Sequence, residues 1–136
     1  MRLLPIAAVI LLGLLVTGCG GSGEGMSVKG KVSLDGQAVD AGSIVFLPSG
    51  GAGSKASAAI EQGQYTVPPE EGLKPGTYRV ELSWFKPTGR KIESSDPGIM
   101  MDETREAFPA KFNTHSTLTA EITSGENVKD FELSSK

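Results

Sequence analysis

The fold of this chain is decided by residues 78–85, which read YRVELSWF. Large apolar side chains occupy every second position of this stretch, at Tyr78, Val80, Leu82 and Trp84. The residues between them are mostly polar, and a period of two is typical of a strand with one buried face. We therefore expect a core strand in which Trp84 buries up to ~250 Å² of surface.

Shorter stretches with strand patterning fill most of the remaining sequence, at residues 28–34, 43–47, 55–60, 64–67, 117–122 and 130–133. The dipeptide Asp35-Gly36 tolerates positive φ and is a strong signal for a hairpin turn, and Gln62-Gly63 is expected to turn the chain in the same way. Pro68 and Pro69 interrupt the ladder because proline lacks the N–H donor. The sequence thus predicts about seven short strands and no helix longer than two turns.

An all-β chain of this size has to bury two sheets against each other, which favours a Greek-key β-sandwich of about seven strands. A β-barrel is the alternative. No repeat of fixed period is visible, and this disfavours propellers and solenoids. One departure lies in the last strand, where Lys129 stands at a position that an apolar residue would occupy if the face of Phe131 and Leu133 were extended.

The connection over about 86–116 is much longer than a usual loop, and loops of this length are commonly functional or mobile. Residues 100–108 within it are expected to make one or two helical turns, stopped by Pro109. Asp102, Glu103 and Glu106 crowd together there, but they lack the spacing and the glycine turn of a calcium loop, so we expect no metal. The candidate contact residues of this loop are Arg90, Met100, Met101, Arg105 and Phe108.

The N-terminus carries an apolar run over residues 3–16, which follows the single basic residue Arg2. This run is shorter than the ~20 residues of a membrane-spanning helix and is typical of a signal peptide. The run ends in Val16-Thr17-Gly18-Cys19, which resembles the lipobox of bacterial lipoproteins. In such proteins signal peptidase II cuts before a cysteine that receives lipid. The alternative is an ordinary secretory signal followed by an incidental free thiol.

The lipobox resemblance divides the chain into three parts. Residues 1–18 are then the signal peptide, residues 19–26 hold the lipidated Cys19 and a flexible Gly/Ser linker, and residues 27–136 form one domain. The resemblance also implies anchoring to a bacterial membrane, with the outer membrane favoured because Gly20 rather than aspartate follows the cysteine. Removal of Arg2 leaves 12 of the 13 basic residues against 16 acidic ones, a balance that argues against nucleic-acid binding.

Several stretches of the domain together resemble a known family. They are VKGKVSLDGQAV at 28–39, IVFLP at 44–48, GQYTV at 63–67 and LKPGTYRV at 73–80, followed by FPAKFN at 108–113, STLT at 116–119, SGEN at 124–127 and DFEL at 130–133. They look like the carboxypeptidase regulatory-like domain, a transthyretin-like (prealbumin-like) β-sandwich, in the lipoprotein version abundant in Planctomycetes. The family has no catalytic motif, so the resemblance implies a fold but no activity.

The residues themselves do not indicate an enzyme or a cofactor. The only histidine, His115, is expected to be a solvated loop residue, because no Gly-x-Ser-x-Gly elbow accompanies it. Zinc needs more nitrogen or sulfur ligands than His115 and a lipidated Cys19 supply. Glu70 and Glu71 are neighbours in a turn rather than a pair of facing carboxylates.

Two non-catalytic functions remain. In the first, the domain is a structural or protein-interaction module of the cell envelope, held by the lipid bilayer through acylated Cys19. In the second, it binds a carbohydrate or another small ligand. Sugar binding calls for exposed aromatic side chains, and most of the eight aromatics stand at positions expected in the core. Phe85, Phe108 and Phe112 are the exceptions, so this second function is disfavoured.

Overall fold

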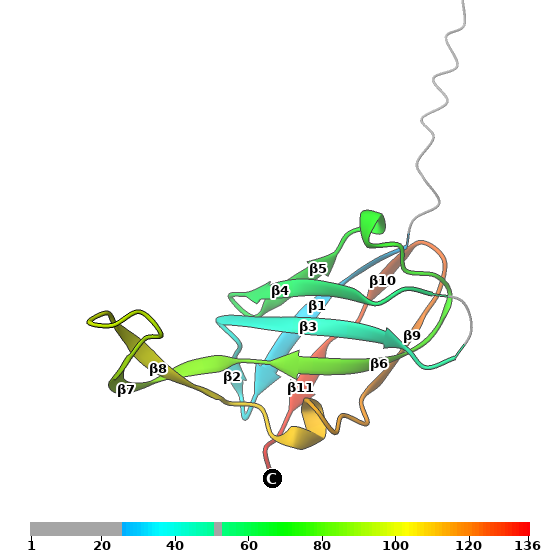
Figure 1. The fold of residues 1–136 in the computed structure, drawn as a ribbon. Coiled ribbons are helices and arrows are strands. Elements are labelled where there is room, and N and C mark those ends of the chain that lie inside the picture. Colours follow the sequence, from blue (N-terminus) through cyan, green and yellow to red (C-terminus); the bar gives the residue numbers. More distant parts are fainter. Residues whose placement is uncertain (1–25, 51–52) are drawn as a thin grey trace, which may run out of the picture.

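The computed structural model describes residues 26–50 and 53–136, which form an all-β protein (Figure 1). The strands are β1 (Ser27–Leu34), β2 (Gln37–Ala38), β3 (Ala41–Pro48), β4 (Ala56–Glu61), β5 (Gln64–Val67), β6 (Gly76–Ser83), β7 (Phe85–Glu93), β8 (Met100–Glu106), β9 (Thr119–Ile122), β10 (Glu126–Val128) and β11 (Phe131–Leu133). Two single 3₁₀ turns, η1 (Pro69–Glu71) and η2 (Ala110–Phe112), join them. No helix in the described ranges is long and apolar enough to cross a membrane.

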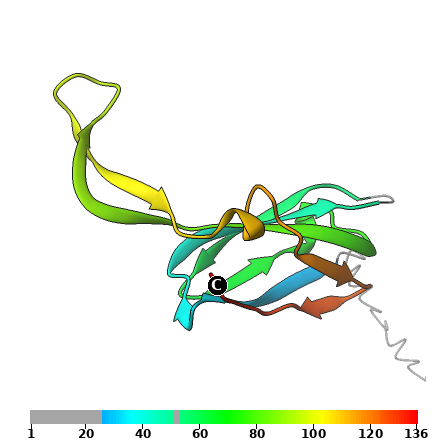
Figure 2. The ribbon, with the colours of Figure 1, turned by 90° about the horizontal axis from the view of Figure 1, so that it is seen from below.

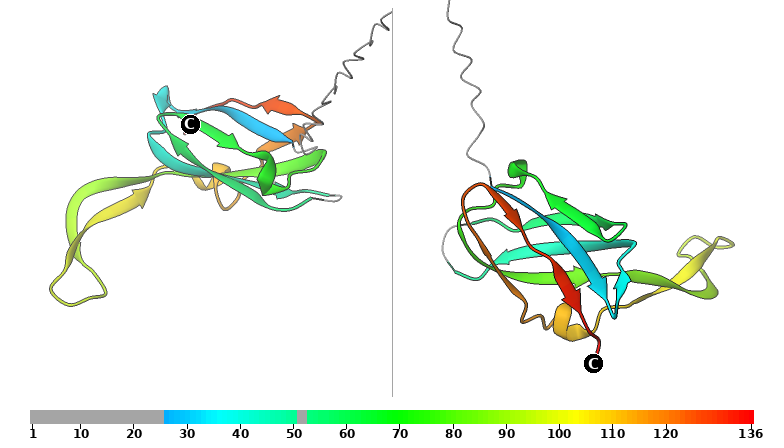
Figure 3. Two further views of the ribbon diagram at one scale, coloured as in Figure 1. Left: turned by 90° about the horizontal axis from the view of Figure 1, so that it is seen from above. Right: turned by 180° about the vertical axis from the view of Figure 1, so that it is seen from behind.

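The main sheet has the order β10-β1-β5-β4-β3-β6-β9, and β2 and β11 also pair with β1. It curls on itself, so that β1, β10 and β11 lie across the core from β3 and β6 (Figures 2 and 3). The two end strands, β9 and β10, pair with β6 and β1 respectively and not with each other. The sheet is therefore open at this corner, and the prediction of a β-sandwich rather than a barrel is confirmed.

The stretch at residues 78–85 forms the core strand that its alternation predicts. Tyr78, Val80 and Leu82 lie on the inner face of β6 and are at most 1% exposed, and Trp84 follows directly after the strand with 2% exposed. β6 lies between β3 and β9 in the sheet. The core it helps to build also contains Phe46, Tyr65 and Phe131, the other aromatics expected there.

Both hairpin signals of the sequence are confirmed. Asp35 and Gly36 have φ values of 51° and 79°, and Gln62 and Gly63 have 51° and 76°. Positive φ at both central residues is the geometry of the two-residue turn that suits the twist of paired strands. These turns join β1 to β2 and β4 to β5.

The C-terminal segment closes the sandwich by pairing in parallel with β1. Its register is the same before and after Lys129, since Lys29 pairs with Val128 and Val32 with Phe131. A side chain at Gly30 would bring its Cβ within 1.8 Å of the Lys129 carbonyl oxygen. Glycine at position 30 therefore lets this carbonyl approach β1 and accept a hydrogen bond of 2.7 Å from the Tyr65 hydroxyl.

The polar contacts on either side of Lys129 complete this closure. Burial, and then the Asp130 carboxylate, raise the pKa of Tyr65 above its usual value, so its hydroxyl stays protonated and donating. Asn127, rather than Lys129, fills an inward position with 6% of its surface exposed. Its amide bridges the open corner by bonding to the backbone N–H and C=O of Thr123, at 3.0 and 2.8 Å.

The connection over 86–116 differs from the sequence-based expectation. The helical turns expected at residues 100–108 are absent, and β8 occupies most of that stretch. A seven-residue helix is marginal by itself, whereas six of the seven residues of Met100–Glu106 pair with β7. The C-terminal part of the connection, including η2 and Ser116, packs on β6 and belongs to the body of the sandwich.

Candidate functional site

Strands β7 and β8 form a hairpin that projects from one end of the sandwich (Figures 2 and 3). They pair antiparallel from Phe85 opposite Glu106 to Glu93 opposite Met100, with a register shift between Pro87 and Lys91. In the described part of the chain these two strands pair only with each other. A two-stranded hairpin is marginally stable alone in water, so contacts at its root are needed to hold it in place.

The Glu106 carboxylate fixes the root of the hairpin. Its Oε1 accepts hydrogen bonds from the backbone N–H groups of Trp84 (2.8 Å) and Phe108 (3.0 Å). Its Oε2 lies 3.3 Å from the amide of Asn113, which also donates to the backbone of Leu82. One carboxylate thus joins both strands of the hairpin to the edge of β6.

The Trp84 indole also helps to hold the root of the hairpin, from the side of the hydrophobic core. Its Nε1–H donates to Asp40 Oδ1 at 2.7 Å. On its other side the Lys86 ammonium lies 4.4 Å from the ring centroid and donates to Gln37 Oε1 at 3.3 Å. A cation over an indole face is attracted by the ring quadrupole, so Lys86 is held toward the body of the protein.

The far end of the hairpin exposes large apolar side chains. Ile92, Ile99, Met100 and Met101 are between 38% and 57% exposed. Ile92 and Met101 are cross-strand partners, so their side chains lie on the same face. The connecting turn is closed by hydrogen bonds from Ser94 N to Ile99 O (2.8 Å) and from Gly98 N to Glu93 Oε1 (3.0 Å). Apolar side chains gathered on a projecting element are typical of a contact surface.

The carboxylates of β8 are each matched by a different partner. Asp102 forms an ion pair of 2.7 Å with Lys91, and Glu103 accepts a hydrogen bond of 2.5 Å from Thr88. Glu106 is engaged at the root. Across residues 26–50 and 53–136, no three His, Cys, Asp or Glu side chains are grouped so as to hold a metal ion.

Four of the five candidate contact residues lie exposed on the hairpin: Arg90, Met100, Met101 and Arg105. The prediction for Phe108 is wrong. Its ring is only 4% exposed, and its centroid lies 6.3 Å from that of Trp84 and 6.4 Å from that of Phe112. Phe108 follows β8, at the point where the chain has already returned to the core.

Two exposed apolar residues of this element are absent from the sequence-based candidates, namely Ile92 and Ile99, with 38% and 55% exposed. Isoleucines inside a long polar connection are the sequence signal that could have identified them. Phe85 is 60% exposed, which confirms the expectation that it lies outside the core.

A hollow of about 560 Å³ lies beside the proximal half of the hairpin. Three cations line it, namely Lys86, Arg90 and Arg105, together with Glu103 and Glu106. Arg90 lies 3.9 Å from the Glu103 carboxylate. Arg105 has no ion-pair partner among the residues that the structure describes, so the hollow presents one uncompensated guanidinium.

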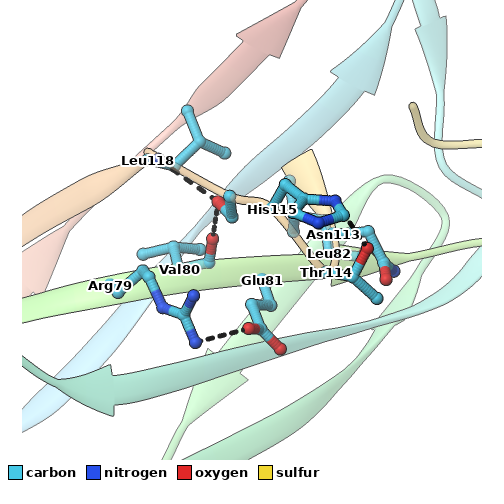
Figure 4. Close-up of polar contacts among 9 residues, drawn as sticks. Arg79, Val80, Glu81, Leu82, Asn113, Thr114, His115 and Leu118 are labelled. Carbon is cyan, nitrogen blue, oxygen red and sulfur yellow. Dashed lines mark hydrogen bonds and ion pairs between the residues drawn. The ribbon is translucent and has the colours of Figure 1, made fainter. Parts of the chain in front are cut away.

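The segment around His115 holds the return of the chain against β6 (Figure 4). His115 is exposed, and its Nδ1 lies 3.3 Å from the hydroxyl of the adjacent Thr114. Ser116 is buried and donates to the carbonyl of Val80. Nearby, Arg79 and Glu81 form an ion pair of 2.8 Å along β6. These contacts attach one segment to another, and they bring no second titratable side chain to the imidazole.

Aromatic side chains form no exposed platform on the described surface. Seven of the eight aromatics of the chain are buried or packed against the core, and Phe85 alone is exposed. A stacking surface for a sugar ring, which the carbohydrate hypothesis requires, is therefore missing from these residues.

Val16, Thr17, Gly18 and Cys19, the residues of the expected lipidation site, lie outside the described residues. The first described residue, Met26, is 7% exposed and belongs to the core of the sandwich. Compared with known families and with curated proteins, the chain matches neither a family model nor a curated protein.

Proposed function

We propose that this chain is an exported bacterial lipoprotein that acts as a non-catalytic protein-interaction module of the cell envelope. In this proposal hairpin β7–β8 contacts a partner protein while acylated Cys19 anchors the chain to a membrane, with the outer membrane favoured. The main support for an interaction is that the hairpin projects from the sandwich and exposes four apolar side chains, Ile92, Ile99, Met100 and Met101.

The anchoring part of the proposal rests on the sequence. The apolar run at residues 3–16 and the motif Val16-Thr17-Gly18-Cys19 supply the signal and the acceptor thiol that lipidation requires. Each buried methylene of an acyl chain contributes about 0.8 kcal/mol, and more than one chain gives stable attachment. The family assignment, a carboxypeptidase regulatory-like domain with transthyretin-like Greek-key connectivity, belongs to the same proposal and is supported by the motifs quoted above and by the all-β sandwich.

The start of the described chain and the hairpin lie at opposite ends of the sandwich, an arrangement that suits an anchored interaction module. The described chain begins beside the start of β1, whereas the hairpin leaves the opposite end of the sandwich (Figure 1). β1 has eight residues, so it separates these two ends by ~23 Å at about 3.3 Å per residue. A tether that precedes residue 26 therefore leaves the hairpin on the side of the body that faces away from the attachment point.

The test compares the full-length lipoprotein with a variant in which residues 87–104 are replaced by Asn-Gly. Lys86 and Arg105 are cross-strand partners, so this dipeptide closes a two-residue hairpin turn between them and keeps Glu106 in place. Crosslinking in intact cells, followed by affinity purification and mass spectrometry, is expected to recover envelope proteins with wild type and to lose them with the variant.

A Cys19→Ser variant is the control for anchoring. It should lose its acyl chains, as measured by mass spectrometry of the purified protein, and should no longer sediment with membranes. Acylation that persists in Cys19→Ser contradicts the lipobox assignment. Recovery of the same partners without the hairpin contradicts the interaction part, and recovery of polysaccharide alone would favour the carbohydrate-binding alternative.

A further inference from the structure

The two outer edges of the hairpin differ in their ability to accept another strand. β7 contains Pro87, which lacks an N–H donor, and its pairing shifts register between Pro87 and Lys91. Proline, lysine and irregular register are the features by which proteins block an edge strand. β8 reads MMDETRE and has no proline and no lysine, and the extra residues of the register shift lie on β7 rather than on β8. Within the described residues its outer edge has no partner strand.

The root of the hairpin carries an unusual cross-strand pair. Lys86 lies directly opposite Arg105, and like charges in this arrangement destabilise a sheet. The Lys86 ammonium lies over the Trp84 ring. The Arg105 guanidinium at the hollow has no ion-pair partner among the described residues. A guanidinium presents two parallel donors and binds a carboxylate in a bidentate manner. The charge at this point therefore complements an acidic side chain.

An apolar contact lies further along the same face. Alternation along β8 places Met101, Glu103 and Arg105 on one face, and Met101 is paired with Ile92. Met101 and Arg105 are four residues apart, or ~13 Å at about 3.3 Å per residue. Methionine is flexible and adapts to different apolar side chains.

We propose that β8 binds an extended segment of a partner protein by antiparallel strand addition along its outer edge. The segment carries an aspartate or glutamate opposite Arg105 and an apolar residue opposite Met101. Because antiparallel strands run in opposite directions, the acidic residue comes first in the partner sequence and the apolar one follows four positions later. This inference rests on the proposed function, since it names the site and the partner chemistry of the same hairpin.

A peptide fits these features better than an anionic polymer does. The free N–H and C=O groups of β8 pair with a peptide backbone, which is the basis of strand addition in other recognition modules. A polyanion would use Arg105 but would leave both the backbone groups and the pair of Ile92 and Met101 without a partner. Arg105→Glu is therefore expected to change which peptides bind rather than simply to weaken binding.

The test uses a phage library of random ten-residue peptides, selected on the immobilised full-length protein in detergent. Wild type should enrich peptides with Asp or Glu four positions before an aliphatic residue. The Arg105→Glu variant should instead enrich Lys or Arg at that position. Arg79→Glu, which changes a half-buried arginine on β6 outside the hairpin, is the control and should select the same peptides as wild type.

The strand-addition geometry is tested with one enriched peptide. Only every second N–H of an added strand points toward β8. N-methylation of one alternate set of residues should therefore weaken binding at least tenfold, while methylation of the other set should leave it nearly unchanged.

Several outcomes would overturn this inference: no enrichment by wild type, the same motif with Arg105→Glu, equal effects of the two methylation patterns, or tight binding of a polyanion such as alginate that competes with the peptides. Hairpin-dependent partners in the crosslinking experiment would leave the proposed function standing in each of these cases. If the crosslinking experiment also recovered no partner that depends on the hairpin, both the inference and the proposed function would be overturned.

Discussion

Trp84 links the hydrophobic core to the root of the hairpin. Its ring is buried, and its Nε1–H and backbone N–H are both satisfied by carboxylates, Asp40 and Glu106. We expect Trp84→Ala to lower the free energy of unfolding by about 3–5 kcal/mol, because it leaves a cavity in the core. This is a large part of a total stability of roughly 5–15 kcal/mol. Urea denaturation followed by circular dichroism measures the loss.

The neighbouring residue provides the control for this prediction. Phe85 is 60% exposed, and substitution of an exposed residue usually changes stability by no more than about 0.5 kcal/mol. Phe85→Ala should therefore unfold close to wild type. If the two variants lost similar amounts of stability, the register of β6 that turns Trp84 inward would be wrong.

Gly30 allows the close approach of the C-terminal segment to β1. In Gly30→Ala the new methyl group would meet the Lys129 carbonyl oxygen, which belongs to the backbone and has little room to move. We expect a loss of about 1–3 kcal/mol, the usual cost of overpacking, together with exchange broadening of the Lys129 and Tyr65 NMR signals. Gly50→Ala is the matched control, since a Cβ there meets nothing within 4 Å. Equal stability of the two variants would contradict the close packing of the C-terminal segment against Gly30.

At the residue scale, local patterning predicted the core well and the candidate site less well. Tyr78, Val80, Leu82 and Trp84 are buried as expected, because a strand fixes which side chains share a face. The burial of Phe108 could not be predicted from strand alternation. Phe108 follows a strand, β8, whose existence depends on pairing with β7 rather than on its own pattern, and its burial depends on contact with Trp84.

At the scale of elements, the turns and seven of the nine strands of the sandwich body were predictable, and β7 and β8 were not. A strand that packs on a core alternates between apolar and polar side chains. The strands of the hairpin are exposed on both faces, so their sequences carry no such alternation. β2 was missed because it contains only two residues. β10 was missed because it begins within Ser124-Gly125-Glu126-Asn127, whose residue types are typical of a turn.

The hairpin should be dispensable for folding of the body. Nearly all of its residues are exposed, and its attachment to the body consists of the buried Trp84 and Phe108 and the half-buried Glu106. Replacement of residues 87–104 by Asn-Gly keeps these three residues. We therefore expect the melting temperature of this variant to stay within roughly 4 °C of wild type, a shift that corresponds to about 1 kcal/mol or less. A drop of 10 °C or more in calorimetry would show that the hairpin is part of the cooperative core.

For the whole molecule, the sequence predicted the class of the fold but not how the sheet closes. The parallel pairing of β1 with β10 and β11 joins residues about a hundred positions apart, and the strand patterns contain no information on which strands become neighbours. The approach of the Lys129 carbonyl to Gly30 is a consequence of that pairing. The root of the hairpin was not predictable from strand patterns either, because it brings together residues from separate segments, namely Asp40, Trp84, Glu106 and Asn113.

The proposed function places the contact with a partner protein on hairpin β7–β8. It is tested most directly by site-specific photocrosslinking in intact cells, with a photoreactive residue in place of Met101 on β8, Thr66 on β5 or Glu132 on β11. All three positions are exposed. We expect a discrete protein adduct from Met101 and none from Thr66 or Glu132. Adducts from the body positions without one from Met101, or no protein adduct from Met101, would contradict it.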